Sequence, residues 1–193
     1  MRVFVAGATG VIGSRLVPLL VEADHEVIGM TRSRSKVAAL IEVGAEPVVC
    51  DVFDAAGLAA AVARAQPDVV MHQLTDLPDD FARFEDFATS HNRIRRVGTR
   101  NLVAAALAVD VSRFIAQSVA WALPGDGGAA VEELEKAVLS YPGVVLRYGQ
   151  FYGPGTYHPA RPPDPPRIHV DEAARRTVAS LDAVPGVFAI VDD

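Results

Sequence analysis

Residues 3–13 of the chain read VFVAGATGVIG. The first four are all apolar, which is typical of a strand covered by helices on both faces. Glycines follow at every third position, Gly7, Gly10 and Gly13, and an apolar-faced helix is expected over residues 11–23. In such a turn the first glycine permits a tight bend. The second lets a ligand approach the backbone, and the third lets the helix pack closely on the strand.

This order of strand, glycine turn and helix predicts a binding site for the pyrophosphate of a dinucleotide. The start of the helix offers unpaired backbone N–H groups and the positive end of the helix dipole. The residues expected to form the site are Gly7, Ala8, Thr9, Gly10, Val11, Ile12 and Gly13. The alternative is a glycine-rich turn that binds nothing.

Short apolar runs alternate with helical patterns along most of the chain. Strands are expected over residues 26–30, 46–50, 68–72, 113–116 and 144–147, and helices over 35–43, 55–65, 84–109 and 129–139. Repeated β-α units with short connections imply a parallel sheet with right-handed crossovers. Residues 1–150 are therefore expected to form an α/β domain, a doubly wound Rossmann-type parallel sheet with helices on both faces.

Residues 151–193 are expected to form a reduced C-terminal substrate region packed on the same domain. Prolines are frequent between residues 159 and 166, so residues 153–167 are expected to form a loop. A short strand over residues 168–170, a helix with Asp171 as its N-cap and a last strand over 187–191 complete the expected fold.

Composition excludes several classes of protein. The formal net charge of −6 argues against nucleic acid or an anionic membrane as the main partner. Cys50 is the only cysteine, so the chain has no internal disulfide, and no metal site is expected. No apolar run has the length of a membrane span or signal peptide, which favours the cytoplasm. Arginines 93, 95, 96 and 100 are expected on a solvent-exposed helix face.

The end of the second strand bears on the choice of cofactor. An acidic residue there would hold the adenosine ribose of NAD, whereas arginine suits the additional phosphate of NADP. Arg32 stands at this point, and Ser33 and Arg34 add possible donors. The sequence favours NADP, with NAD possible. Ordinary basic loop residues are the alternative.

Six segments match, in sequence and in order, segments of a known protein family. They are residues 7–13, 50–54 (CDVFD), 92–102 (NRIRRVGTRNL), 117–118 (QS), 146–155 (LRYGQFYGPG) and 168–174 (IHVDEAA). In this order they resemble the NAD-dependent epimerase/dehydratase-like group of the extended and atypical short-chain dehydrogenases/reductases. The resemblance covers almost the whole chain, which makes it more specific than any single motif.

The resemblance implies roles for residues at the ends of several strands. Contacts with the adenine are implied for Asp51 and Val52, and contacts along the ribose and phosphate path for Leu74 and Thr75. The nicotinamide pocket would be bordered by Tyr148, Gly149 and Tyr152. Ser118 would hydrogen-bond the substrate oxygen, and Tyr148 is the second catalytic candidate. Structural roles are the alternatives: Asp51 in a turn, Ser118 as a strand-end cap and Tyr152 in packing.

One motif of the family is missing. The family uses Tyr-x-x-x-Lys on the helix after the fifth strand for proton transfer, and the matching positions here are Gly127 and Val131. The connections on the substrate side are also short. The lead hypothesis is an NAD(P)-binding oxidoreductase or epimerase-like protein acting on a small carbonyl or hydroxyl substrate. The alternatives are a non-catalytic NADP-binding sensor or interaction module, and a shortened relative that needs a partner. The resemblance also suggests a homodimer face, formed by the long helix over residues 84–109 and its neighbour over residues 129–139.

Overall fold

The computed structural model describes residues 1–78 and 81–192. Within this range seven parallel strands form the main sheet, in the order β3-β2-β1-β4-β5-β6-β9. Their bounds are β1 (Arg2–Ala6), β2 (Glu26–Thr31), β3 (Glu46–Val49), β4 (Val69–His72), β5 (Arg113–Val119), β6 (Gly143–Tyr148) and β9 (Gly186–Ile190). The chain builds outward from β1 in one direction and then in the other, so the predicted doubly wound α/β fold is confirmed.

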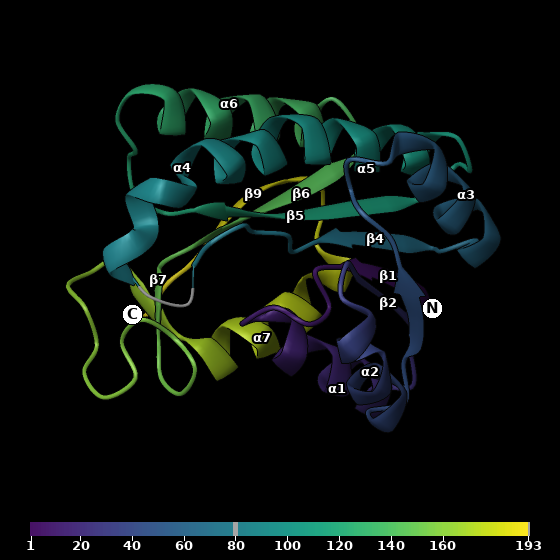
Figure 1. Ribbon diagram of the computed structural model, residues 1–193, viewed down its shortest axis with the longest axis horizontal. Helices are drawn as coiled ribbons and strands as arrows, with labels where there is room; N and C mark the ends of the chain where they lie inside the picture. Colours follow the sequence, from purple (N-terminus) through teal and green to yellow (C-terminus); the bar gives the residue numbers. More distant parts are fainter. Residues whose placement is uncertain (79–80, 193) are drawn as a thin grey trace.

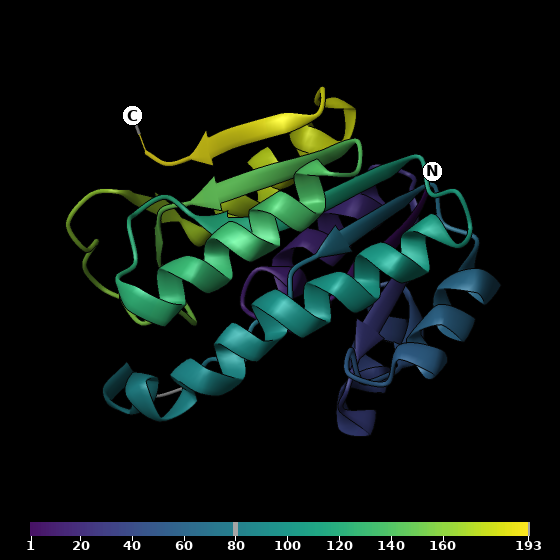
Figure 2. The ribbon, with the colours of Figure 1, turned by 90° about the horizontal axis from the view of Figure 1, so that it is seen from above.

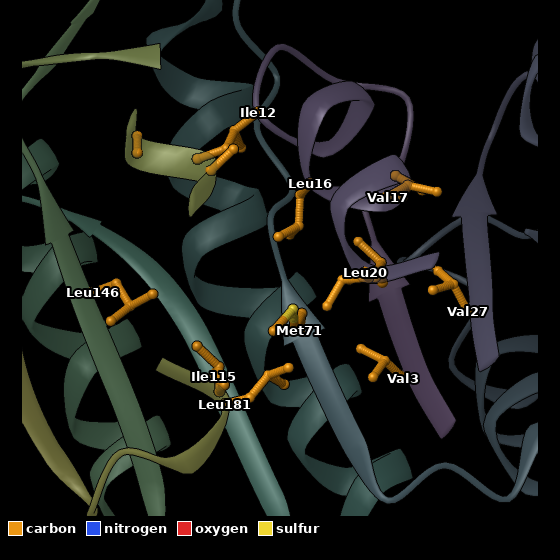
Figure 3. Packing of buried hydrophobic residues seen from close by; sticks show 14 of the residues in the cluster. Val3, Ile12, Leu16, Val17, Leu20, Val27, Met71, Ile115, Leu146 and Leu181 are labelled. Atoms are coloured by element: carbon orange, nitrogen blue, oxygen red, sulfur yellow. The ribbon is translucent and has the colours of Figure 1, made fainter. Parts of the chain in front are cut away.

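Helices cover both faces of the sheet (Figure 1). One face carries α1 (Gly13–Glu22), α2 (Val37–Glu42) and α7 (Val170–Ala179). The other carries α3 (Ala55–Ala65), α4 (Phe84–Arg93), α5 (Thr99–Leu107) and α6 (Gly125–Leu139). Alternate residues of β1 serve the two layers: Val3 and Val5 pack beneath α1, and Phe4 and Ala6 pack on the α3 side. Figure 3 shows the first layer, in which Leu16 and Leu20 of α1 meet Met71 of β4.

The helix expected over residues 84–109 is continuous but not uniform (Figure 2). Between α4 and α5 lies a π-helical turn, Ile94–Gly98, and the helix ends at Leu107. π turns are rare and are found frequently at functional sites. Of the arginines expected on an exposed face, Arg93 and Arg100 are exposed, whereas Arg95 and Arg96 are half-buried.

Two expectations about helix starts are wrong. Helix α6 begins at Gly125 rather than at residue 129, because a side chain at Gly128 would lie 2.3 Å from the Leu123 carbonyl oxygen and glycine leaves that path open. Helix α7 begins at Val170, and its N-cap is His169, whose Nδ1 accepts the N–H of Asp171 at 3.3 Å. The Asp171 carboxylate instead pairs with Arg15 of α1 at 2.8 Å.

The C-terminal segment completes the main sheet. Strands β7 (Gln150–Tyr152) and β8 (Arg167–His169) form a small second sheet, of which β7 was not expected, and the proline-rich loop connects them. Strand β9 then pairs with β6 at the edge, where Val187 and Phe188 remain partly exposed. No helix of the described residues has the length and hydrophobicity to cross a membrane.

Candidate functional site

The glycine turn lies between β1 and α1, at the carboxyl edge of the sheet. Gly7 has a φ of +93°, and a side chain there would meet the backbone oxygen of Gln73 at 2.5 Å. At Gly13 a side chain would lie 2.1 Å from the Gly7 oxygen, so helix and strand contact closely. Gly10 differs, because its nearest neighbour would be 3.4 Å away. The outer side of Gly10 is therefore open to a ligand.

The start of α1 also leaves backbone donors available. Ser14 and Leu16 donate to the carbonyls of Gly10 and Ile12. Val11 and Ile12 precede the first residue of α1, and their N–H groups have no backbone acceptor among the described residues. Unpaired N–H groups at a helix start attract anions. The residues present therefore fit a pyrophosphate.

The turn after β2 is tied to the glycine turn. Thr31 Oγ1 lies 3.1 Å from Thr9 Oγ1, and Lys36 Nζ donates to the carbonyl of Thr9 at 3.3 Å. Arg32 and Arg34 follow Thr31 and are exposed. Two arginines and a lysine thus stand beside the glycine turn, and no carboxylate occurs within residues 31–36.

The residues implied after β3 and β4 lie at the same edge of the sheet. Asp51 Oδ1 accepts the N–H of Phe53 at 2.9 Å, so its predicted alternative as a turn residue is present in the structure. Val52 is buried, and its carbonyl accepts from Asn101 of α5. Leu74 is held at both backbone groups, by His72 Nδ1 and by Gln117 Nε2, and the side chain of Thr75 is exposed.

A hollow of about 490 Å³ lies where the ends of β2 and β3 meet α3. Arg32 and Asp51, two of the predicted cofactor residues from different strands, both line it. Asp54 and Arg64 contribute further charges. The hollow therefore lies beside Arg32 of the basic turn.

Ser118 is engaged in a buried network. Its hydroxyl donates to Glu135 Oε1 of α6 at 2.6 Å, and both side chains are almost fully buried. Arg147 of β6 donates to both oxygens of the same carboxylate, at 2.8 and 2.6 Å. Burial opposes ionisation of Glu135, but the hydrogen bonds from Arg147 and Ser118 outweigh it and lower its pKa. The structure therefore shows Ser118 linking β5 to α6.

The positions of the missing tyrosine and lysine lie on α6. Gly127 is in the first turn of the helix and Val131 is one turn later. Both are half-buried on the helix that covers β5 and β6. Neither carries a group that can donate, accept or orient a proton.

Tyr148 lies in the core rather than at the open edge. Its side chain is 3% exposed, its ring packs beside Phe151, and its hydroxyl lies 2.6 Å from Thr177 Oγ1 of α7. Burial raises the pKa of Tyr148 to about 12, only partly offset by the hydroxyl of Thr177 and the amide of Gln73. This placement suits a packing role and no exchange of protons with a substrate.

Gly149 and Tyr152 belong to the connection from β6 to β7. A side chain at Gly149 would lie 2.6 Å from the backbone of Arg167, so glycine permits β7 and β8 to meet. The Tyr152 hydroxyl donates to Asp192 at 3.0 Å, and its ring meets the edge of His169. The hydrogen bond to Asp192 is the main reason that the pKa of Tyr152 is raised.

Three polar residues near the turn were not singled out from the sequence. Asp76, after β4, forms an ion pair with Arg32 at 2.8 Å, and its N–H donates to His91 Nδ1. Gln73 is 3% exposed, and its amide atoms make no hydrogen bond of good geometry within the described residues. Their position was the one indication in the sequence. Gln73 and Asp76 belong to the segment that follows β4, and His91 lies on α4 against that segment.

The family model described as NAD dependent epimerase/dehydratase family matches residues 3–136. This chain belongs to that family. A 3-diazoavenalumate denitrifying reductase from Streptomyces sp. is 35% identical over 243 residues, covering all of this chain and 76% of the relative. A 3-beta-hydroxysteroid dehydrogenase from Mycolicibacterium neoaurum is 32% identical over 116 residues, or 59% of this chain and 31% of the relative.

Solved structures agree on the fold of this family member. A UDP-glucose 4-epimerase from Thermotoga maritima, solved with UDP-glucose, superimposes with a TM-score of 0.80 at 20% identity, over 99% of this chain and 77% of that one. The Thermus thermophilus UDP-glucose 4-epimerase, solved with NAD, gives 0.79 at 20% identity, over 99% and 78%. At this identity the likeness establishes the fold alone.

Proposed function

We propose that this chain is an NADP-preferring oxidoreductase of the family that acts on a small carbonyl or hydroxyl substrate. The observation that carries the proposal is the glycine turn, with its open Gly10 and free N–H groups, beside the basic turn of Arg32 and Arg34. The family is NAD-dependent by its description, and a reductase is among the relatives. The predicted cytoplasmic location and homodimer through the helix over residues 84–109 belong to the same proposal.

The chain's own residues would bind and orient the cofactor. The N–H groups of Val11 and Ile12 would hold the pyrophosphate, and Arg32 with Arg34 would hold the 2′-phosphate. Asp51, Val52, Leu74 and Thr75 would border the adenosine, and Gly149 and Tyr152 would stand near the nicotinamide. A bound nicotinamide would supply or accept a hydride at this edge. Tyr148 would stand outside the catalytic groups, because its hydroxyl is buried against Thr177.

The test is a parallel titration with NADPH and NADH, followed by fluorescence. The proposal expects tighter binding of NADPH, and a loss of that preference in Arg32→Asp because the variant repels the 2′-phosphate. Arg113→Gln is the control, because this arginine lies at the start of β5, on the opposite edge of the sheet. A chain that binds neither nucleotide would contradict the proposal.

A second function is favoured by the substrate side. Gly127 and Val131 cannot move protons, and the Ser118 hydroxyl is engaged by Glu135. These observations support a non-catalytic NADP-binding sensor or interaction module. Such a protein would bind NADPH tightly without turning over a panel of aldehydes, ketones and alcohols. Turnover that disappears in Ser118→Ala would exclude it.

A further inference from the structure

Arg95 is a cation without a matching anion among the described residues. It belongs to the π turn between α4 and α5 and is half-buried. Within residues 1–78 and 81–192, its guanidinium donates a single hydrogen bond, from Nη1 to Asn92 Oδ1 at 3.2 Å, and forms no ion pair. Burial lowers the pKa of Arg95 to about 10, so the group remains charged at neutral pH. A desolvated charge with no carboxylate partner is destabilising.

The neighbouring arginines are accommodated differently. Arg96 pairs with Asp126 and Glu133 of α6, both at 2.7 Å. The Arg93 guanidinium lies 3.8 Å above the Phe53 ring, and Arg100 is exposed to solvent. Arg95 is therefore the member of this cluster whose charge has no balancing group among the described residues.

The helix geometry places Arg95 beyond the carboxyl end of β4. Thr99 Oγ1 lies 3.0 Å from Nε2 of His72, the last residue of β4. Arg95 is one turn earlier on the same side of a helix that runs back along the sheet, so it stands about 5 Å past the strand end. In open α/β sheets this is the side on which ligands bind.

Arg95 also adjoins the first turn of α6, where the tyrosine of the family motif is missing. Its partner Asn92 donates through Nδ2 to Asp126 Oδ2 at 2.8 Å, and Asp126 directly precedes Gly127. Figure 2 shows α4 and α6 side by side along this contact. The half-buried cation and the position of the missing tyrosine are thus linked through the hydrogen bonds of Asn92.

We propose that Arg95 binds an oxyanion group of the substrate, a carboxylate or a phosphate, beside the reacting carbon. The planar guanidinium fork matches either group with two parallel hydrogen bonds. The proposal rests on the proposed function for the position of the reacting carbon. It narrows the substrate to a small organic anion.

The test uses benzoate and phenyl phosphate, with benzamide as the uncharged analogue of the same shape. Binding to the full chain is measured by calorimetry, with and without saturating NADPH. At least one anion is expected to bind tenfold or more tightly than benzamide, and the stronger of the two identifies the preferred group. Arg95→Gln should remove the difference and Arg95→Lys should keep part of it. Arg100→Gln, an exposed arginine one turn away, should leave it unchanged.

Thermal unfolding separates this role from a structural one. Because Arg95 has no carboxylate partner in the part of the chain that the structure describes, Arg95→Gln should keep or raise the Tm while it loses anion binding. A wild-type chain that binds benzamide as well as both anions would overturn the proposal. So would a glutamine variant that still prefers an anion, or one whose Tm falls by more than about 5 °C. Anion preference without NADPH binding would reject the proposed function and retain Arg95 as an anion site.

Discussion

Arg32 and Asp76 form an ion pair of 2.8 Å between the turn after β2 and the segment after β4. The Asp76 side chain is 18% exposed, whereas that of Arg32 is 67% exposed. Burial opposes ionisation of Asp76, but the hydroxyl of Ser90 and the guanidinium of Arg32 together lower its pKa. The arginine proposed for the 2′-phosphate is therefore already paired with an anion.

Asp76→Asn should raise the affinity for NADPH about two- to fivefold and leave that for NADH unchanged. The carboxylate competes with the 2′-phosphate for Arg32, and a pair whose arginine is exposed to water contributes about 1 kcal/mol. Fluorescence titration at low salt measures the change, which should shrink as salt is added. Asp86→Asn, which removes the exposed pair with Arg83, is the control. Equal gains for both nucleotides would contradict this interpretation of Asp76.

Gly10→Ala and Gly13→Ala should differ sharply although they lie in one turn. The Gly13 variant places a methyl group 2.1 Å from the Gly7 oxygen and should lose about 3 kcal/mol of unfolding free energy. The Gly10 variant meets nothing closer than 3.4 Å, so it should fold normally and lose nucleotide binding. Urea unfolding and NADPH titration of both variants provide the comparison. Wild-type affinity in Gly10→Ala would rule out close approach of the pyrophosphate to this glycine.

Glu135→Gln should destabilise the chain at pH 7 by about 1–2 kcal/mol. Breaking a buried pair costs more, but the Arg147 side chain is 47% exposed and water replaces part of the interaction. The pKa of Glu135 is lowered in the folded chain, so the contribution is complete above the ordinary value of about 4.3 and disappears as the pH falls below it. Urea unfolding should be measured at about pH 7 and at about pH 3.5, roughly one unit below that value. The difference in unfolding free energy between wild type and Glu135→Gln should be smaller at the lower pH.

His72 should make the stability of the chain depend on pH between about 6.5 and 4. It is fully buried, its Nδ1 accepts the Leu74 N–H and its Nε2 contacts Thr99 Oγ1, so one neutral tautomer satisfies both nitrogens. Burial lowers its pKa to about 4, so the unfolded chain takes up the proton first and stability falls as the pH falls. The loss for this group should be about 3 kcal/mol. His72→Gln should show a flatter pH profile in urea unfolding.

Patterns of apolar residues were sufficient to predict the layers of the fold. The runs at β1, β2 and β4 are buried on both faces, and this requires the two helical layers that the structure shows. The start of α6 was missed because glycine normally weakens a helix, whereas here Gly128 avoids the Leu123 carbonyl. The N-cap of α7 was assigned to Asp171 on side-chain preference, but that carboxylate lies closer to Arg15.

The candidate site was predictable only where backbone conformation and close backbone packing determine the residue type. Glycine positions follow from turn geometry and helix packing, so Gly7 and Gly13 have the predicted surroundings. The surroundings of Ser118 and Tyr148 depend on which helix covers each strand end. Their partners, Glu135 and Thr177, are 17 and 29 residues away, and no local pattern identifies them.

The pairing of α1 with α7 has a consequence for how the chain acquires its structure. Arg15 and Asp171 are 156 residues apart, and the layer beneath β1 joins Leu16 and Leu20 to Ala173 and Leu181. Contacts between distant residues slow folding, because a long loop must close before they form. During synthesis α1 leaves the ribosome long before α7, so its apolar face must wait for that partner. Until then its apolar face is a surface that chaperones can hold.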